Sequence, residues 1–175
     1  MKIIPAKIKG GYVPILVDDE DYEWLSRFTW FIMAGRYAAR QEYSHSIKKP
    51  GAKRAQSHYV KTYMHREIMD AQPGQLVDHA NRNTRDNRRE NLRICTRSQN
   101  QANRIGKSGG TSRFKGVKKA HPSTGMVSRP WVAEIIVDGE YSHLGYFATE
   151  EDAAAAYDSA ALAAHGDFAL TNGLK

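Results

Sequence analysis

Residues 76–104, LVDHANRNTRDNRRENLRICTRSQNQANR, restrict the fold of this chain more than any other segment. The segment is dense in asparagine and arginine and holds few apolar residues. Because buried polar groups must find hydrogen-bond partners, it cannot form an ordinary apolar core. The runs QLVDHA and NLRICT alternate as strands do, on either side of a polar loop over residues 80–90. A short helix over residues 97–105 follows, for which Thr96 or Ser98 is a suitable N-cap.

Four side chains of this segment are suited to phosphodiester hydrolysis. Asp78 and Asn100 offer oxygen ligands to a hard divalent cation, which can relieve the charge on a phosphate. His79 can take a proton from water near neutral pH. Asn91, at the start of the second strand, can hydrogen-bond across the hairpin and orient the imidazole. Neighbours on a regular strand point to opposite faces, so we expect the strand to end or kink at Asp78 and His79.

The segment resembles the HNH nuclease motif, in the variant found in phage and intron-encoded homing endonucleases. The matching residues are V-D-H, N-L-R and Q-N-x-x-N, and YMHREIM resembles the helix that precedes the motif in those proteins. The resemblance implies a ββα-metal core with one Mg²⁺ or Mn²⁺. It implies that His79 is the general base, that Asp78 and Asn100 bind the metal, and that Asn91 positions the base. Asn100 in place of the motif's last histidine favours an oxygen-preferring ion over zinc.

The positive charge of the chain is concentrated in its middle. The net charge is +7, and residues 61–120 hold 14 Lys and Arg against 5 Asp and Glu. Residues 121–175 hold 2 against 8 and are acidic. A local basic segment favours a polyanionic partner, and nucleic acid first. Four arginines of the loop over residues 80–90 are more than solvation requires, and we expect them to lie against phosphates: Arg82, Arg85, Arg88 and Arg89.

The amino-terminal part predicts a mixture of strands and short helices. YVPILV (12–17) predicts a strand, and the helical spacing that follows predicts a helix to about Phe28. TWFIMAGRYAAR (29–40) predicts two short strands around a turn. Residues 41–57 are polar and basic and contain Pro and Gly, which predicts a loop suited to phosphate contacts. Residues 58–70 predict a strand that leads into a short helix.

A Gly/Ser-rich linker, GKSGGTS (106–112), predicts a domain boundary. We therefore expect a nuclease domain over residues 1–105, with the motif core at 75–104, and a second domain over 113–175. In the second domain RFKGVKKA, PWVAEIIVDG and EYSHLGYFA predict three antiparallel strands, with a hairpin turn at Asp-Gly. The acidic T-E-E-D start at Thr149 predicts a helix. The expected fold class is α+β: a ββα core with N-terminal strand and helix elements, plus a three-stranded antiparallel sheet packed on one helix.

Residues 113–172 resemble the apetala-type, or ethylene-response-factor, DNA-binding domain. The matching stretches are FKGVKK, WVAEI, HLGYF, EEDAAAAYDSAA and HGDFALTN. The resemblance implies that the sheet enters the major groove of DNA with the helix behind it. Ile136 and Tyr141 stand where the plant domains carry arginines, so we expect affinity and coarse register rather than stringent sequence choice. The DNA-binding residues predicted for the whole chain are Arg82, Arg85, Arg88, Arg89, Arg104, Arg113, Lys115, Lys118, Lys119, Arg129, Glu134, Tyr141 and His143.

Cysteine usage and hydropathy bear on the class of protein. Cys95 is the single cysteine, which excludes a disulfide framework and a cysteine-based zinc cage. Lys7 and Lys9 interrupt the apolar run that a signal peptide needs, and no run approaches the roughly 18 apolar residues of a membrane span. We expect a soluble, cytoplasmic protein in the host cell of a phage or mobile element.

These observations together predict a metal-dependent DNA endonuclease of the homing type. The expected partner is double-stranded DNA, bound by a monomer or a dimer, with no membrane and no small-molecule cofactor. Whether it nicks one strand or cuts both is left open. Two alternatives remain, a catalytically inactive DNA-binding regulator that uses the C-terminal sheet, and an RNA-binding module suggested by the basic segment alone.

Overall fold

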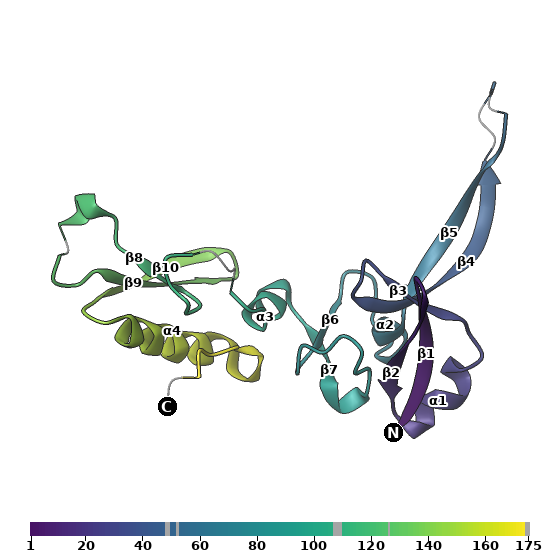
Figure 1. Cartoon of the computed structure of the whole chain (residues 1–175), viewed down its shortest axis with the longest axis horizontal. Coiled ribbons are helices and arrows are strands. Elements are labelled where there is room, and N and C mark those ends of the chain that lie inside the picture. The colour runs from purple at the N-terminus through teal and green to yellow at the C-terminus, as the bar shows by residue number, and fades with distance from the viewer. Residues whose placement is uncertain (48–49, 52, 107–109, 126, 174–175) are drawn as a thin grey trace. The chain divides into compact units, whose positions relative to one another are not determined.

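The computed structural model has an α+β fold (Figure 1) and describes all residues except 48–49, 52, 107–109, 126 and 174–175. It divides into two compact units, Met1–Ile94 and Cys95–Lys175. This division falls ahead of the predicted linker, of which residues 107–109 lie outside the described part. The domain ranges expected from the sequence stay a prediction. In the described part of the chain, no helix combines the length and the apolar character needed to cross a membrane.

The first unit is built on a five-stranded sheet with the order β2-β1-β3-β4-β5. Its strands are β1 (Lys2–Ile8), β2 (Gly11–Val17), β3 (Trp30–Met33), β4 (Tyr37–Ile47) and β5 (Gln56–Tyr63). β1 and β3 are parallel, and the other neighbours are antiparallel. The strand expected at residues 12–17 is confirmed. β1 was not expected, because it buries only Ile4 and Ala6 and its lysines hide the alternation.

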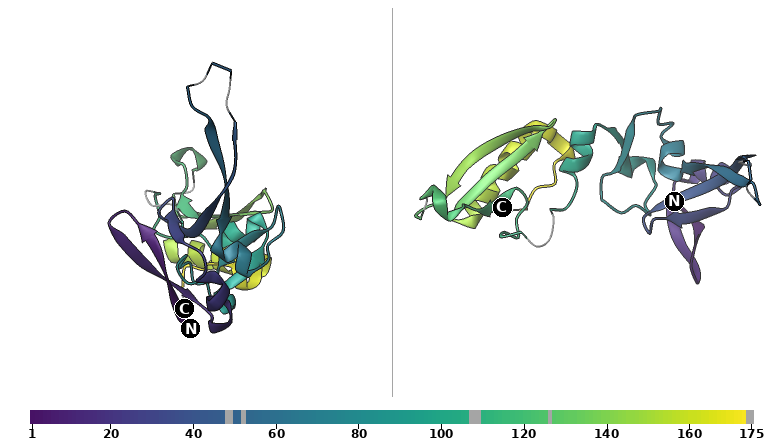
Figure 2. Two further views of the ribbon diagram at one scale, coloured as in Figure 1. Left: turned by 90° about the vertical axis from the view of Figure 1, so that its right-hand side faces the viewer. Right: turned by 90° about the horizontal axis from the view of Figure 1, so that it is seen from above.

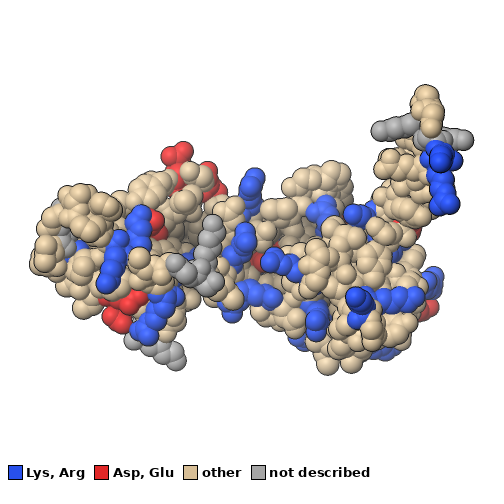
Figure 3. Space-filling view, turned by 45° about the horizontal axis from the view of Figure 1, so that its top comes forward, with Lys and Arg blue, Asp and Glu red and all other residues tan. Residues whose placement is uncertain are grey.

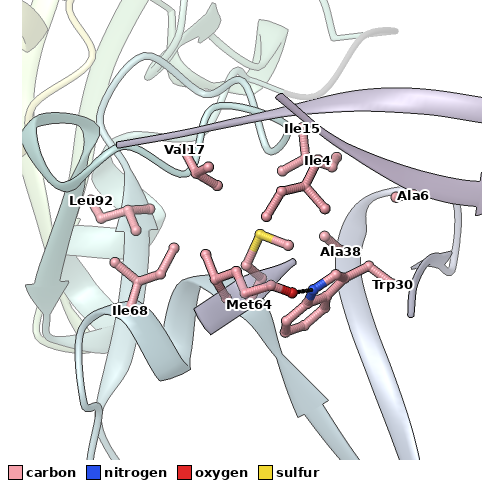
Figure 4. Close-up of a cluster of buried hydrophobic side chains, with 10 residues drawn as sticks. Ile4, Ala6, Ile15, Val17, Trp30, Ala38, Met64, Ile68 and Leu92 are labelled. Carbon is pink, nitrogen blue, oxygen red and sulfur yellow. Dashed lines mark hydrogen bonds between the residues drawn. The ribbon is translucent and has the colours of Figure 1, made fainter. Parts of the chain in front are cut away.

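One apolar core joins this sheet to two short helices, α1 (Asp19–Leu25) and α2 (Met64–Ile68). Figure 4 shows its side chains converging from β1, β2, β3 and α2. Trp30 is 1% exposed, and its indole Nε1 donates a hydrogen bond of 2.9 Å to the carbonyl of Leu25. The indole thereby fixes the end of α1 against the sheet.

The loop expected over residues 41–57 is wrong for its described strand residues. β4 and β5 continue as a two-stranded ribbon, paired from Ala39 with Tyr63 to Ile47 with Gln56. Figures 1 and 2 show the ribbon standing away from the rest of the first unit. Neither face of the ribbon is packed on a core, so the sequence lacks the apolar alternation that marks a half-buried strand.

The polar segment forms a small sheet of its own. β6 (Leu76–His79) pairs with β7 (Leu92–Cys95), and the one-turn helix η1 (Arg89–Asn91) directly precedes β7. β6 ends at His79. This end was expected, because Asp78 and His79 would point to opposite faces of a continuing strand. Leu92 carries the segment into the core of the first unit.

The second unit begins with α3 (Arg97–Ala102), where Thr96 and Gln99 form a reciprocal capping box. A three-stranded antiparallel sheet of order β10-β9-β8 follows. Its elements are β8 (Val117–Lys119), η2 (Pro122–Thr124), β9 (Trp131–Val137), β10 (Glu140–Phe147), α4 (Glu150–His165) and η3 (Gly166–Phe168). α4 packs on the sheet through small residues, Ala153 and Ala154 against Val117 and Ala133. The expected three-stranded antiparallel sheet packed on one helix is confirmed for this unit.

Candidate functional site

Asp78 and His79 end strand β6 and are both buried, with 7% and 4% of their surface exposed. Arg93 of β7 donates two hydrogen bonds to Oδ2 of Asp78, from Nε at 2.9 Å and from Nη2 at 2.8 Å. A buried carboxylate requires such a charged partner. The pairing of β6 with β7 therefore places a compensated negative charge next to the imidazole in the chain.

The imidazole of His79 lies among polar and aromatic side chains. Its Nε2 is 3.4 Å from Oδ1 of Asn87, and its ring centroid is 5.2 Å from that of His65 and 6.0 Å from that of Tyr37. Burial lowers the pKa of His79, and the hydrogen bond with Asn87 opposes this shift only in part. His79 is therefore neutral at pH 7, which is the form that can accept a proton.

Asn91 directly precedes β7 and hydrogen-bonds across the hairpin, and its role in positioning the base stays a prediction. It lies in η1, its Nδ2 donates a hydrogen bond of 2.7 Å to the carbonyl of Asp86, and its Oδ1 accepts one of 2.9 Å from the backbone of Asn81. Its carbonyl also accepts a hydrogen bond of 2.8 Å from the backbone of Ala80. Asn91 thus closes the loop that follows His79, while Asn87 stands beside the ring.

Asp86 organises the interior of this loop. Its carboxylate is 2% exposed and accepts hydrogen bonds from Nε and Nη2 of Arg88 at 2.8 and 2.7 Å and from Nδ2 of Asn81 at 2.9 Å. The hydrogen bonds from Arg88 hold the pKa of Asp86 below its usual value. The polar composition of the loop therefore provides the partners that its own buried groups require.

The loop is also attached to the sheet of the first unit by hydrogen bonds. The backbone of Leu16 in β2 donates to the carbonyl of Arg85 at 2.8 Å and accepts from the backbone of Asn87 at 2.8 Å. The Thr84 hydroxyl donates a hydrogen bond of 2.6 Å to the carbonyl of Arg36. These bonds fix the position of Asn87, and Asn87 in turn contacts the Nε2 side of the His79 ring.

The four loop arginines divide into two pairs. Arg88 forms ion pairs with Asp86 and Glu90, and Arg89 forms ion pairs with Asp21 and Glu20 of α1. Their carboxylate partners offset the positive charge of both arginines, and a contact of either residue with phosphate stays a prediction. Arg82 and Arg85 have exposed side chains and keep the phosphate-binding prediction.

Asn100 belongs to α3 of the second unit and is half-buried. Its pairing with Asp78 at a metal rests on the spacing of the sequence motif. Among the residues that the structure describes, no three side chains of His, Cys, Asp or Glu form a group that could hold a metal ion. A metal held by Asp78 and Asn100 therefore stays a prediction, based on the preference of Mg²⁺ and Mn²⁺ for oxygen donors such as a carboxylate and a carboxamide.

Lys118, Glu134 and Tyr141 lie on the sheet face opposite α4. Lys118 Nζ is 2.6 Å from Glu134 Oε2, and the hydroxyl of Tyr141 donates a hydrogen bond of 3.0 Å to the same oxygen. Ala133 and Ile135 pack on the other face with residues of α4, so Glu134 between them points away from the helix. His143 is exposed on β10, with its ring centroid 4.8 Å from that of Tyr146.

Lys115 is only partly exposed, and its expected DNA contact stays a prediction. Its side chain is half-buried, Nζ donates to the carbonyl of Ala102, and its backbone donates to Oδ1 of Asn172 at 2.7 Å. Gly116, which follows it, turns the chain with φ of +75°, and the regular strand β8 begins only at Val117.

The remaining basic candidates of the second unit are exposed. Arg113 pairs with Glu151 at 3.1 Å, and Lys119 Nζ lies 5.5 Å from the ring centroid of Trp131. Arg104 and Arg129 lie on exposed loop segments. All four keep the prediction of a DNA contact.

Two residues of the site were not expected from the sequence, Asn87 and Tyr37, and His65 of α2 lies beside the imidazole as well. His65 is 8% exposed, and no described residue hydrogen-bonds its Nδ1. Burial lowers the pKa of His65 to about 3. The motif spacing points to Asn91 rather than Asn87, and contacts of His79 with rings from β4 and α2 depend on tertiary packing that no local pattern reveals.

Comparison with known families places the site in a recognised segment. Residues 72–102 match the model of a family described as HNH endonuclease. The match covers β6, the polar loop, β7 and α3. A search of curated proteins finds no match for the chain. The segment that carries Asp78, His79, Asn91 and Asn100 is therefore similar to HNH endonucleases, which indicates a nuclease.

Proposed function

We propose that this chain is a metal-dependent endonuclease that hydrolyses phosphodiester bonds of double-stranded DNA. The observation that carries the proposal is the buried neutral imidazole of His79, adjacent to the carboxylate of Asp78, at the end of a strand within the segment similar to HNH endonucleases. The homing type is proposed on the resemblance of V-D-H, N-L-R and Q-N-x-x-N alone.

In this proposal His79 is the general base. The oxygen of Asn87 faces Nε2, which favours the tautomer that carries its proton there and leaves the lone pair on Nδ1. Nδ1 then takes a proton from the attacking water. The water oxygen forms a bond to phosphorus as the bond to the 3′ oxygen breaks, with inversion, and the 3′ oxygen receives a proton from solvent.

Asp78 and Asn100 are proposed to hold one Mg²⁺ or Mn²⁺. When bound, the ion would stabilise the charge on the phosphate and on the departing oxygen. Arg93 helps to keep the Asp78 carboxylate in place by donating two hydrogen bonds to Oδ2. Asn91 acts on the base through the loop that it closes.

The second unit is proposed to supply affinity for duplex DNA. Its exposed sheet face carries Lys118, Glu134 and Tyr141, and Glu134 is neutralised by Lys118. The acidic residues Glu150, Glu151 and Asp152 lie in the first turn of α4, on the other side of the sheet. The acidic balance of this half is thus compatible with a DNA-binding sheet face.

The experiment is cleavage of supercoiled plasmid with Mg²⁺, with Mn²⁺ or with EDTA. We expect nicked or linear product only with metal, and a fall of about 100-fold or more for His79→Ala, which should still bind DNA in EDTA. His121→Ala, at an exposed position of the second unit, is the matched control and should cleave normally.

Two outcomes would overturn the proposal. Unchanged cleavage by His79→Ala would show that the activity arises elsewhere. Tight DNA binding without cleavage in either metal would favour a DNA-binding regulator, for which the second unit alone provides a surface. Competition between duplex DNA and single-stranded RNA separates both from an RNA-binding module.

A further inference from the structure

The β4–β5 ribbon, residues 41–61, has an exposure that the fold does not explain. Every described residue in it is exposed except His58, which is half-buried. An isolated two-stranded ribbon is marginally stable in water, because neither face buries apolar surface. The ribbon is held by its own cross-strand pairs, among them Tyr43 with Tyr59 at 5.9 Å and stacked His45 with His58 at 4.8 Å between ring centroids.

The two faces of the ribbon differ in chemistry. The register shift between Tyr43 and His45 marks a bulge, which adds one extra residue to β4. Beyond the bulge, the alternation of side chains between the two faces is therefore shifted by one residue along β4. One face, the hydroxyl face, therefore consists of Gln41, Tyr43, Ser46, Ser57, Tyr59 and Lys61. Hydrogen bonds from Tyr43 to Ser46 at 3.0 Å and between Ser46 and Ser57 at 3.2 Å confirm that these side chains share a side. The hydroxyl face holds several donors, one lysine and no acid.

The charge of the ribbon is positive. The sequence from residue 41 to 63 has five Lys and Arg against one acid, Glu42. Glu42 lies on the face opposite to the hydroxyl face and forms an ion pair with Arg40. Lys53 and Arg54 are exposed near the end of the ribbon, where Figure 3 shows basic side chains. The ribbon thus offers uncompensated positive charge next to hydroxyl donors.

We propose that the β4–β5 ribbon is a DNA-binding element that enters the major groove of duplex DNA. The major groove is about 12 Å wide and admits a two-stranded ribbon, whose strands lie about 5 Å apart. Hydroxyl donors and lysine suit phosphate oxygens and the acceptor groups of base edges, and the basic end suits the backbone. The inference rests on the proposed function for its substrate, but it concerns a surface separate from the cleavage site.

The test uses the full chain, a duplex of about 40 base pairs, and EDTA, so that binding is measured without cleavage. The ribbon variant is Lys53→Glu with Arg54→Glu. The control is Lys7→Glu with Lys9→Glu, which makes the same change in charge at exposed positions beside the β1–β2 turn. We expect the ribbon variant to bind at least about tenfold more weakly and to flatten the slope of log affinity against log salt by about 2, at about 0.9 per phosphate contact. The control should change the slope little.

Two further measurements address the groove and the hydroxyls. On a duplex whose cytosines carry a glucosyl group in the major groove, wild type should lose more affinity than the ribbon variant. The loss that remains in the ribbon variant would come from the sheet of the second unit, which is expected in the same groove. Tyr43→Phe with Tyr59→Phe keeps the ring pair and removes two hydroxyls, so affinity should fall several-fold at an unchanged salt slope.

The inference fails if the ribbon and control variants bind equally, or if wild type and the ribbon variant respond equally to the modified duplex. It also fails if the ribbon variants change the oligomeric state instead of DNA affinity, since that outcome assigns the open strand edge to a second copy of the chain. If one of these results is found while plasmid cleavage depends on His79, the DNA-binding role of the ribbon is wrong and the proposed nuclease function stands. If DNA binding depends on the ribbon but no cleavage occurs, the ribbon's role stands and the nuclease function is wrong.

Discussion

Single polar residues determine whether the loop after His79 can hold an imidazole in one orientation. Asn87 is 1% exposed and is bound on three sides: its backbone donates to Leu16, its Nδ2 donates to the carbonyl of Thr84 at 3.3 Å, and its Oδ1 faces His79. A side chain fixed in this way can orient another, because its own movement is restricted.

We therefore predict that Asn87→Leu slows cleavage about tenfold at saturating DNA and leaves DNA affinity unchanged. Leucine is similar in size and removes the oxygen beside Nε2, so the base loses its orientation and its pKa falls further, because the hydrogen bond with Asn87 raises that pKa. Single-turnover rates measured well below the unfolding temperature provide the test. Asn83→Ala, at an exposed position in the same loop, is the control, and equal rates for the two variants would contradict the role of Asn87.

His65 makes the stability of the first unit depend on pH. Its pKa is about 3 in the folded chain against an ordinary value of 6.5, so the unfolded chain binds the extra proton between these values. Folding is then favoured at high pH, and this site should lower the free energy of unfolding by about 2 kcal/mol between pH 7 and pH 5. His65→Phe should flatten the dependence without abolishing it, because burial also lowers the pKa of His79. Urea unfolding at the two pH values measures this, and equal slopes for variant and wild type would be evidence against it.

At the scale of elements, β8 and α4 approach each other closely because residue 116 is glycine. A Cβ built on Gly116 would lie 1.9 Å from Cδ2 of Tyr157, and the residue has φ of +75°. Both the space and the backbone conformation exclude a side chain. The approach lets the alanines of α4 contact Val117 and Ala133 directly.

Gly116→Ala should therefore destabilise the second unit by about 2–4 kcal/mol, combining backbone strain with overpacking. Gly125→Ala separates the two causes, since Gly125 has φ of +69° and a Cβ at this position would meet none of the described atoms within 4 Å. It should cost about 1 kcal/mol from strain alone. Thermal unfolding followed by near-ultraviolet circular dichroism compares the variants, and equal losses would show that the contact with Tyr157 relaxes at little cost.

Elements with local signals were predicted well from the sequence. Thr149 caps α4 by accepting a hydrogen bond of 3.1 Å from Asp152, and the Asp138-Gly139 turn has the positive φ values of 52° and 91° that this pair favours. The ribbon was missed because solvent lies on both of its faces and no periodic apolar pattern arises. Pro50 and Gly51, read as loop signals, lie between its two strands.

The candidate site was predictable only in part, because some of its contacts join segments that are far apart in the sequence. Asp78 and His79 follow from a motif, and both lie where the strand ends. The neighbour of the imidazole could not be predicted, because Asn87 reaches His79 through bonds of the loop to β2. Arg88 and Arg89 were predicted as phosphate ligands from charge alone, and their carboxylate partners become visible only once α1 and the loop are folded.

The two compact units of the molecule differ in the groups that they provide. The first holds buried groups suited to proton transfer, and the second holds an exposed sheet face with few uncompensated charges. If the first unit cleaves DNA and the second binds it, variants in the first should change the cleavage rate and variants in the second should change the affinity. Lys119 and Arg129 are suitable for this test because both are exposed and neither supports the core of the second unit.

We predict that Lys119→Glu with Arg129→Glu raises the DNA concentration for half-maximal cleavage about tenfold and keeps the single-turnover rate at saturation. His79→Ala should do the opposite, with affinity kept and the rate lost. The reason is physical: contacts with phosphates far from the reacting bond stabilise the bound ground state and the transition state equally, so they change affinity and leave the chemical step alone. Titrating DNA in single-turnover cleavage separates the two quantities. A fall in the saturated rate of the Lys119 and Arg129 variant would mean that the second unit also positions the scissile phosphate, and an unchanged half-maximal concentration would remove these two residues from the DNA interface.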